Sequence, residues 1–420
     1  MKIFLYNCIF LILLPFMVVR IFIKSFSDKD YLKGFPNRFG FYKVKPKDNL
    51  IWFHAVSLGE VISSKAIIKK ILNDNNVVLT VSTPTGLREA KKIYQEELVV
   101  VYAPWDFDLF VRNFISTFRP IALILFETEI WPSTIHLTSK KNIPSILSNA
   151  RLSKSSFKKY YSLRLFTKDI FRKISLILAQ SEEHVIRFKK MGVLEKNIIQ
   201  VGSVKFDFDL VSGDKEIKNN NIIMASSTHK GEDQIIIDAF SKLKKDSPEL
   251  KLILVPRHPE RADSILKILN RKKINSRITS KVSYLKDADV VVINTTGQLN
   301  SLYKIANITF IGGSLISKYG GHNIIEAAAN KCAFIVGPYM KNFEDILNLF
   351  KAKNACIQLL NSNDLSQSFR ELLNNNELRI NMIDNAIEVV SENRGSSEKQ
   401  FNNIIKLVNY EISNSNNKTI

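Results

Sequence analysis

The stretch LIWFHAVSLGE at residues 50–60 decides the fold class. Its first four residues, Leu50 to Phe53, are apolar and typical of a buried strand, and Gly59 allows a tight turn into an apolar-periodic helix. Short apolar runs of this kind alternate with amphipathic stretches of helical length through most of the chain. Fully apolar strands separated by helices indicate parallel sheets that are covered on both faces. We therefore predict an α/β protein.

The predicted strands form two series of similar size. The first series comprises Leu50–Phe53, Val77–Val81, Leu98–Tyr102, Ile121–Phe126, Ser145–Leu147, Leu176–Ala179 and Ile198–Val201. The second comprises Asn221–Ala225, Leu252–Val255, Val290–Ile293, Ile308–Ile311, Ala333–Val336 and Ala355–Ile357. A polar stretch, Ser212 to Asn221, separates them, so we predict two doubly wound, Rossmann-like domains at residues 24–211 and 212–410. Their carboxyl-edge loops are expected to line a cleft, and a polar tail follows at 411–420.

Composition narrows the classes of protein. The 420 residues are 45% hydrophobic and 24% charged, which excludes a disordered chain and a polytopic membrane protein. Sixty Lys and Arg against 40 Asp and Glu favour anionic partners, whether phosphates, acidic lipid or nucleic acid. Cys8, Cys332 and Cys356 lie far apart without CxxC spacing, which argues against a disulfide framework, a zinc site or redox chemistry.

The N-terminus has the length of a membrane anchor. Residues 3–19 carry no charge, and apolar residues resume at 21–23, which is about enough to span a hydrocarbon core. Residues 24–48 then hold seven basic and three acidic side chains, a bias that keeps such flanks cytoplasmic and attracts acidic headgroups. No small-x-small cleavage site follows the apolar run, so we predict an uncleaved anchor at 1–23. The alternative is an apolar helix that packs on the domain.

Glu60 follows the first strand closely enough to reach the mouth of the predicted sheet. A carboxylate there can act as a general base on a substrate hydroxyl. Ser57 and Glu60 also have the spacing of a capping box, in which the glutamate only satisfies a backbone N–H. On spacing alone the capping interpretation is favoured, because helix caps are far commoner than catalytic bases.

Two further acids, Glu127 and Glu129, follow the strand that ends at Phe126. With Trp131, whose ring can pack on a sugar, they suit a site for a polar substrate. A first-turn acid and Pro132 near a helix start explain part of the pattern equally well. The sequence gives these two interpretations equal support.

Basic residues follow other strands. Lys205, in the segment GSVKFD at 202–207, is placed to neutralise a phosphate or carboxylate, although an ordinary solvated lysine is the commoner case. Arg257 and His258 follow the strand that ends at Val255 and are placed to reach a base or phosphate. His229, after the first strand of the second domain, belongs to the same predicted cleft.

The strongest local signal is a pair of glycine turns. Gly312-Gly313-Ser314 follows a strand, and Gly320-Gly321-His322-Asn323 opens a helix. Backbone N–H groups in such loops and at a helix N-terminus hold phosphates. Capping by Asn323 and Glu326 is the alternative, but it does not require four glycines. Neither GxGxxG nor GxxxxGK[ST] is present, so no hydride cofactor or P-loop is indicated.

Taken together, these motifs resemble the Kdo transferases, which attach 3-deoxy-D-manno-octulosonic acid to the lipid A precursor. The matching stretches occur in the order of that family: WFHAVSLGE at 52–60, ETEIWPS at 127–133, NARLS at 149–153, AQSEEHVIRF at 179–188, GSVKFD at 202–207, SSTHKGED at 226–233, PRHPER at 256–261 and GGSLISKYGGHNIIEAA at 312–328.

The resemblance implies a GT-B glycosyltransferase that uses CMP-Kdo and a lipid A precursor such as lipid IVA. It implies inversion, no metal, no cofactor, no nucleic-acid partner, and anchoring at the cytoplasmic face of the inner membrane. It implies that Glu60 is the general base and that Lys205 with Glu127 or Glu129 stabilises the transition state. The implied CMP-Kdo-binding residues are Arg257, His258, Gly297, Gln298, Leu299, Gly312, Gly313, Ser314, Gly321, His322, Asn323, Ile324, Ile325 and Glu326.

The sequence is also compatible with two rival functions. One is a GT-B glycosyltransferase with another activated sugar or acceptor. The other is a membrane-anchored protein that binds polyanions without catalysis. This chain also departs from the family's DTMGEL-like segment, where Asn294 and Gln298 replace two acids with amides that keep shape but lose charge.

Overall fold

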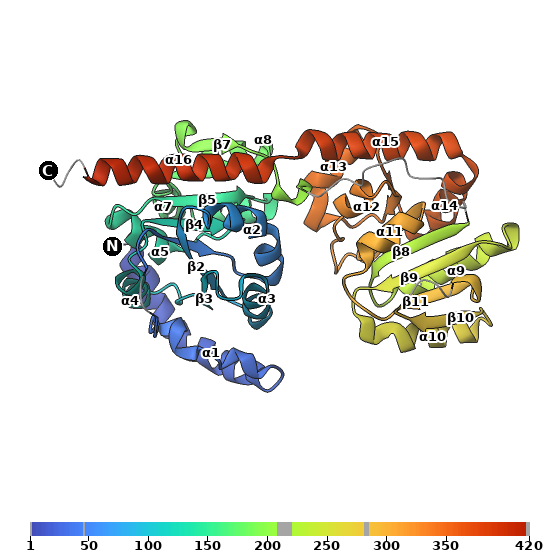
Figure 1. The fold of residues 1–420 in the computed structure, drawn as a ribbon, viewed down its shortest axis with the longest axis horizontal. Helices are drawn as coiled ribbons and strands as arrows, with labels where there is room; N and C mark the ends of the chain where they lie inside the picture. Colours follow the sequence, from blue (N-terminus) through green and yellow to red (C-terminus); the bar gives the residue numbers. More distant parts are fainter. Residues whose placement is uncertain (1, 45–46, 208–220, 281–284, 417–420) are drawn as a thin grey trace. The chain divides into compact units, whose positions relative to one another are not determined.

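The computed structural model describes residues 2–44, 47–207, 221–280 and 285–416. These residues form two compact units (Figure 1). Unit 1 comprises residues 1–207 together with 395–420, and unit 2 comprises residues 208–394. The predicted boundary stretch, 212–221, lies almost wholly outside the described residues.

Unit 1 is built on a seven-stranded parallel sheet in the order β3-β2-β1-β4-β5-β6-β7. Its strands are β1 (Leu50–His54), β2 (Asn76–Val81), β3 (Val99–Tyr102), β4 (Ala122–Phe126), β5 (Ser145–Ala150), β6 (Leu176–Ala179) and β7 (Ile198–Gln200). Alternate residues of β1 enter different cores: Ile51 and Phe53 pack on one face of the sheet, and Leu50 and Trp52 on the other. Burial on both faces explains why these strands are continuously apolar.

Helices cover this sheet. They are α1 (Lys2–Ser25), α2 (Leu58–Ile71), α3 (Pro84–Tyr94), α4 (Asp108–Phe118), α5 (Pro132–Lys140), α6 (Lys154–Ser162), α7 (Arg164–Phe171), α8 (Glu182–Lys190) and α16 (Ser396–Asn416), with the 3₁₀ turns η1 (Lys29–Tyr31), η2 (Phe35–Phe39), η3 (Glu195–Asn197) and η4 (Val204–Phe206). The C-terminal helix α16 lies along α2 and β5 (Figure 1).

Unit 2 repeats the plan with a parallel sheet in the order β10-β11-β9-β8-β12-β13-β14. The strands are β8 (Ile222–Thr228), β9 (Lys251–Pro256), β10 (Ser276–Thr279), β11 (Val290–Ile293), β12 (Ile308–Ile311), β13 (Ala333–Val336) and β14 (Ile357–Gln358). The helices are α9 (Glu232–Asp246), α10 (Ala262–Arg271), α11 (Leu299–Ile305), α12 (Ile325–Ala329), α13 (Glu344–Ala352), α14 (Leu365–Asn374) and α15 (Asn376–Asn393), with η5 (Pro259–Arg261), η7 (Lys341–Phe343) and η8 (Ser362–Asp364).

The predicted fold class is confirmed, because both units are parallel, helix-covered α/β sheets. The sequence pattern missed β10, an edge strand of mixed polarity with no fully buried residue. The last helix also runs to Asn416, past the start of the predicted polar tail at 411. The pattern grouped this helix with the second domain, whereas its contacts place it in unit 1.

Candidate active site

The order of the strands locates a site in each sheet. In unit 1 the first strand, β1, lies inside the sheet. It is therefore a neighbour of β4, although β2 and β3 come between them in sequence. In unit 2, β8 and β12 are neighbours in the same way. Loops that leave such neighbouring strands diverge, and ligands bind at these points in open α/β sheets. The predicted acids follow β1 and β4, and the first predicted glycine turn follows β12.

Glu60 stands in the first turn of α2, beyond the end of β1. Its Oε2 accepts a hydrogen bond from the Val56 amide at 2.7 Å, and its Oε1 accepts one from the Ser57 hydroxyl at 3.1 Å. Ser57 makes no side-chain cap at this helix, so the reciprocal bonds of a capping box do not form. Burial, followed by the charges of Glu129 and Glu127, raises the pKa of Glu60 to about 8. The pKa is thus close to the range that suits a general base near neutral pH.

Glu127 follows β4 in the left-handed backbone region, with φ of 63°. Its amide donates to the Ser148 carbonyl of β5, which holds this unfavourable conformation. Its carboxylate pairs with Lys205 Nζ at 3.1 Å. The structure therefore brings Lys205 of η4 to the same edge of the sheet as the acids.

Glu129 has different partners. The Trp131 indole donates to Glu129 Oε2 at 2.6 Å, and the Trp131 ring packs edge-on against His54 with centroids 4.6 Å apart. Burial raises the pKa of Glu129, and the neighbouring Glu127 adds to this effect. His54 is buried, which lowers its pKa to about 3 and keeps the ring neutral. The sequence left Glu127 and Glu129 equivalent, whereas the structure gives one a lysine and the other an indole.

The motif analysis missed Gln400 of α16. Its Oε1 accepts from the Asn149 amide at 2.7 Å and from the Ser148 hydroxyl at 2.6 Å. Asn149 Oδ1 in turn accepts from the Val204 amide at 3.3 Å, immediately before Lys205. These bonds connect the C-terminal helix to the turn that carries Lys205. No local pattern marks Gln400, because its partners lie about 250 residues away.

In unit 2 the glycine turn after β12 is held by a buried acid that the motif analysis also missed. Glu232, which is 0% exposed, accepts from the amides of Gly313 and Leu315 at 2.7 and 2.9 Å and from the His229 amide at 2.8 Å. A Cβ at Gly312 would lie 2.6 Å from the Ser227 carbonyl, so this position requires glycine.

The glycine amides have acceptors within the protein. The Gly312 amide donates to Ser226, that of Gly313 to Glu232, and that of Gly321 to Gly313. The Ser314 hydroxyl donates to the Ile311 carbonyl and accepts from the Gly337 amide. In this structure these three amides therefore donate within the protein, and phosphate binding by Gly312, Gly313 and Gly321 stays a prediction.

Two histidines meet beside this loop. Their Nε2 atoms, in His229 and His322, are 2.8 Å apart, and His229 stacks on Tyr319 with centroids 3.9 Å apart. Burial lowers the pKa of each histidine to about 4. The ring centroids of His258 and His229 are 5.7 Å apart. The positive charge of Arg257 also lowers the pKa of both His229 and His322. An anion is the ligand that this group of imidazoles and guanidinium favours.

The second predicted turn leads into a helix of only five residues, α12. Asn323 Oδ1 accepts from the Ile325 amide at 3.1 Å, and Asn323 Nδ2 donates to Glu326 at 3.1 Å. Burial raises the pKa of Glu326, and Arg257 opposes that shift. The turn thus brings Asn323 and Glu326 close to Arg257, whereas a helix this short contributes little dipole.

The segment that departs from the family pattern follows β11, the neighbour of β9. Gln298 Nε2 donates to the Ser280 carbonyl at 2.9 Å, and Leu299 begins α11. Gly297 has φ of 82°, and a Cβ there would meet nothing within 4 Å. This segment lies at the same edge of the sheet as Arg257, because β9 and β11 are parallel neighbours.

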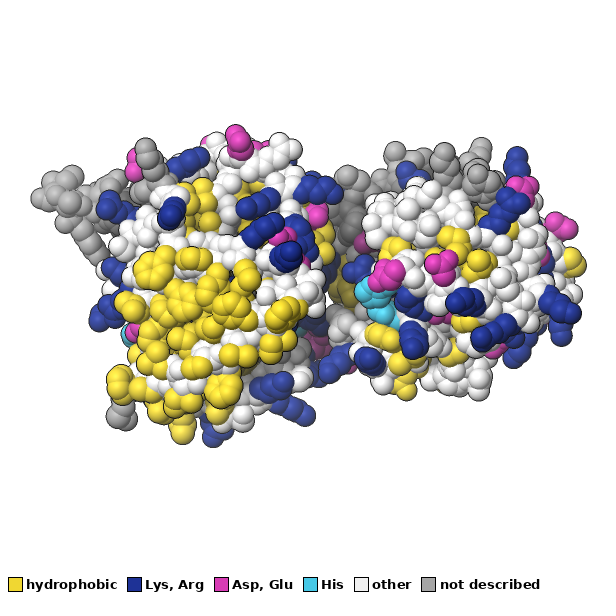
Figure 2. Space-filling view, turned by 90° about the horizontal axis from the view of Figure 1, so that it is seen from below, with side chains coloured by type: hydrophobic (Ala, Val, Ile, Leu, Met, Phe, Trp, Pro, Cys, Tyr) yellow, Lys and Arg dark blue, Asp and Glu magenta, His cyan; other side chains and the backbone are white. Residues whose placement is uncertain are grey.

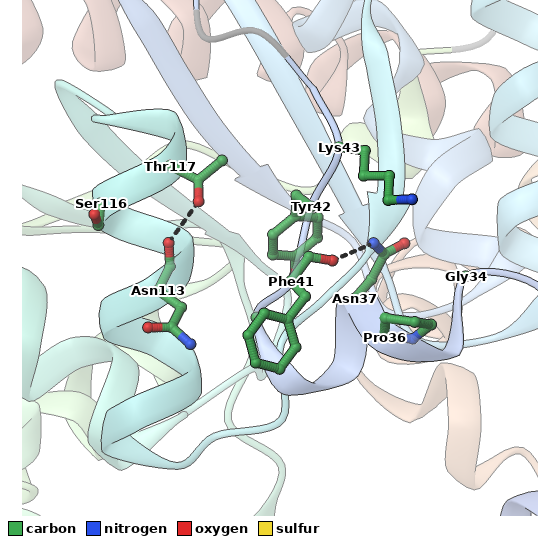
Figure 3. Close-up of a pocket in the computed structure, with 10 residues that line it drawn as sticks. Gly34, Pro36, Asn37, Phe41, Tyr42, Lys43, Asn113, Ser116 and Thr117 are labelled. Carbon is green, nitrogen blue, oxygen red and sulfur yellow. Dashed lines mark hydrogen bonds between the residues drawn. The ribbon is translucent and has the colours of Figure 1, made fainter.

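A pocket of about 680 Å³ lies elsewhere in unit 1, between η2 and α4 (Figure 3). Phe41, Asn113 and Lys43 are among its lining residues, and none of the residues that line it is Asp, Glu, His or Cys. Its titratable lining residues are Tyr42 and Lys43, and it contains none of the predicted site residues.

Solved structures share this architecture. A crystal structure of a glycosyltransferase from Rickettsia africae matches with a TM-score of 0.56 at 17% identity and covers 89% of this chain and 100% of its own. The Anabaena protein Alr3699/HepE in complex with UDP matches with a TM-score of 0.58 at 13% identity and covers 88% and 100%. These likenesses establish the fold alone. Two Rossmann-like parallel-sheet units with these neighbours define a protein of GT-B-like fold.

Sequence comparison identifies the family. The family model for 3-deoxy-D-manno-octulosonic-acid transferase (kdotransferase) matches residues 33–208, and that for glycosyl transferases group 1 matches residues 218–389. A 3-deoxy-D-manno-octulosonic acid transferase of Haemophilus influenzae is 31% identical over 94% of this chain and 96% of its own, and one of Rickettsia typhi is 33% identical over 82% and 77%. The chain belongs to the 3-deoxy-D-manno-octulosonic acid (Kdo) transferase family, so the resemblance seen in its motifs is confirmed.

Proposed function

We propose that this protein transfers Kdo from CMP-Kdo to a lipid A precursor in lipopolysaccharide synthesis, with inversion and without a metal. Membership of the Kdo transferase family supports the sugar. The observation that carries the chemistry is Glu60, a half-buried carboxylate with a pKa of about 8 beside Glu127, Glu129 and Lys205. The donor, the acceptor and the stereochemistry belong to the proposal.

In the proposed reaction an acceptor hydroxyl oxygen bonds to the anomeric carbon of Kdo. The bond from that carbon to the CMP phosphate oxygen breaks, and its electron pair leaves with CMP. Glu60, as the carboxylate, takes the hydroxyl proton, which makes the oxygen a better nucleophile as the bond forms. Trp131 offers an apolar ring face to the acceptor sugar, and Glu129 offers an acceptor oxygen.

The proposed donor site lies in unit 2. Arg257, with His258 and the His229–His322 pair, supplies donors for the phosphate, and Glu326 with Asn323 supplies polar groups for the nucleoside. Lys205 is proposed to stabilise negative charge as CMP departs, since preorganised charge is commonly the largest catalytic contribution. Catalysis then requires the donor held by unit 2 to reach Glu60 of unit 1.

The proposed location is the cytoplasmic face of the inner membrane. Among the described residues one helix, α1, is long and apolar enough to cross a bilayer, with a mean hydropathy of 2.2. Its outer side exposes large apolar side chains, including Phe4, Ile12 and Phe16 at about 70% each, and Figure 2 shows a broad apolar area over this part of unit 1. Its other side packs on Phe107 and Trp105. We propose that α1 lies along the domain with its apolar face in the bilayer.

The test is CMP release from CMP-Kdo by the full chain in detergent, with and without a tetraacylated lipid A precursor, followed by mass spectrometry of the lipid. Lipid-dependent release with one or more Kdo mass increments is expected. CMP binding without release would disprove the assigned donor or acceptor. Parallel assays with other activated sugars address the rival glycosyltransferase, because Asn294 and Gln298 remove charge near the proposed nucleotide site.

A further inference from the structure

Tyr6 and Asn7 are polar side chains on the side of α1 that packs against unit 1. The Tyr6 hydroxyl donates to Asp106 Oδ2 at 2.9 Å, and Asn7 Oδ1 accepts from the Asp108 amide at 3.0 Å. A helix held by lipid alone gains nothing from such groups, because polar groups are costly in hydrocarbon. Directional hydrogen bonds to the protein therefore seat α1, in addition to apolar packing.

Asp106 lies between β3 and α4 and is 6% exposed. Its Oδ1 accepts from the amide and hydroxyl of Thr134 at 2.8 and 2.7 Å, and its Oδ2 accepts from the Ser133 amide at 3.0 Å as well as from Tyr6. A carboxylate at the first amides of a helix satisfies their donors and complements the helix dipole. Trp131, at the N-cap of α5, makes no side-chain cap. Asp106 therefore caps α5 from another part of the chain.

The N-terminus of α5, which Asp106 caps, directly follows the segment that carries Glu127 and Glu129. Trp131 directly precedes Pro132, the first residue of α5, and its indole holds Glu129 at 2.6 Å. Glu129 is in turn the carboxylate with the largest electrostatic influence on Glu60. A displacement of the first turn of α5 therefore moves Trp131 and Glu129 relative to Glu60.

We propose that Tyr6 and Asp106 are positioning residues that couple the packing of α1 on the domain to the positions of Glu129 and Trp131. Tyr6 supplies one of four hydrogen bonds to Asp106, and the other three hold α5. Packing of α1 on the domain then orders the segment between β4 and α5, which carries Glu129 and Trp131, through Asp106. This inference rests on the proposed function for its activity readout.

The experiment compares Tyr6→Phe and Thr134→Val with a matched control, Tyr94→Phe. The Tyr94 hydroxyl is buried in the same unit and has no hydrogen-bond partner in the described part of the chain, so its removal breaks no bond. For Tyr6→Phe and Thr134→Val we expect kcat with the lipid acceptor to fall on the order of 3- to 10-fold, the effect of one hydrogen bond. The dissociation constant for CMP is expected to stay unchanged.

The pH profile separates positioning from mere stability. The charged groups around Glu60 are Glu127, Glu129 and Lys205, which pairs with Glu127. When Glu129 moves away, repulsion at Glu60 falls, so the acidic limb of the kcat profile shifts to lower pH in Tyr6→Phe and Thr134→Val. Addition of Tyr6→Phe to Asp106→Asn is expected to cause no further change. A Tyr6→Phe enzyme with the profile and kcat of Tyr94→Phe would overturn the inference.

Hydrogen–deuterium exchange tests the same coupling without turnover. The amides of Ser133 and Thr134 are expected to exchange faster in Tyr6→Phe than in Tyr94→Phe, because their common acceptor has lost a partner. Equal exchange would overturn the coupling. Faster exchange in a protein whose wild type releases no CMP would leave the coupling intact and disprove the proposed function instead.

Discussion

At the scale of single residues, Glu60 shows how tertiary contacts change the interpretation of a spacing. Ser57 and Glu60 have the spacing of a capping box, yet the Ser57 hydroxyl donates to the carboxylate and caps no amide. Burial and two neighbouring acids then raise the pKa of Glu60. The spacing alone cannot reveal those neighbours, because they follow a different strand.

We expect Glu60→Gln to lower turnover by about 10²- to 10⁴-fold, the usual contribution of a general base. The amide keeps the shape of the side chain but cannot take the acceptor proton. CMP binding, measured by calorimetry, should not change. Glu96→Gln, at an exposed position of the same unit, is the control, and nearly normal turnover in Glu60→Gln would exclude its role as the base.

The pKa of Glu60 predicts the pH dependence of the rate. A base must be deprotonated, so kcat should rise with pH, reach half of its plateau near pH 8 and level off above that pH. Glu129→Gln removes a negative charge that raises this pKa, so the rising limb should move to lower pH. The measurement is a kcat profile between pH 5 and 9. An unshifted limb would show that Glu60 does not govern it.

The His229–His322 pair predicts proton uptake when CMP binds. Both pKa values lie near 4 in the free protein, and a bound phosphate favours one proton shared by the pair, so affinity should increase as the pH falls. Calorimetry at pH 6 in two buffers of different ionisation enthalpy measures the uptake, and His229→Gln should reduce it. Equal enthalpies in the two buffers would contradict this. The charged or titratable groups around His229 are His258, His322, Tyr319, Arg257 and Arg261.

At the scale of elements, the strands and their following loops could be predicted because their signal is local. The apolar runs recur with helical stretches between them, and residues such as Glu60 and Glu127 follow strand ends within a few residues. The edge strand β10 and the attachment of α16 to unit 1 could not be predicted. The first has no fully buried face, and the second depends on contacts between distant parts of the chain.

The attachment of α16 is tested by Gln400→Ala. This change leaves the Asn149 amide and the Ser148 hydroxyl without their acceptor, which should cost about 1–3 kcal/mol of unfolding free energy. The matched control is Gln200→Ala, at an exposed position of β7. Denaturant titration of both variants gives the difference. Equal stabilities would show that Gln400 does not hold α16.

At the scale of the whole molecule, the distribution of apolar surface predicts membrane binding. Phe16→Asp places a charge on the outer side of α1 and should weaken flotation with vesicles that contain acidic lipid. Leu194→Asp, an exposed apolar position away from α1, is the matched control. The basic residues that follow α1 should make binding weaker at high salt. Undiminished flotation of Phe16→Asp would disprove the proposed membrane face.

By itself the sequence determined the α/β class, the two series of strands, the position of the apolar helix and the acids and bases after the strands. These features depend on periodicity and on neighbours within a few residues. Only the tertiary structure decided that α16 packs in unit 1, that Glu232 accepts from the Gly313 amide, and that Asp106 joins Tyr6 to α5. Hydrogen bonds and pKa shifts depend on which residues meet in space, and no local pattern encodes those meetings.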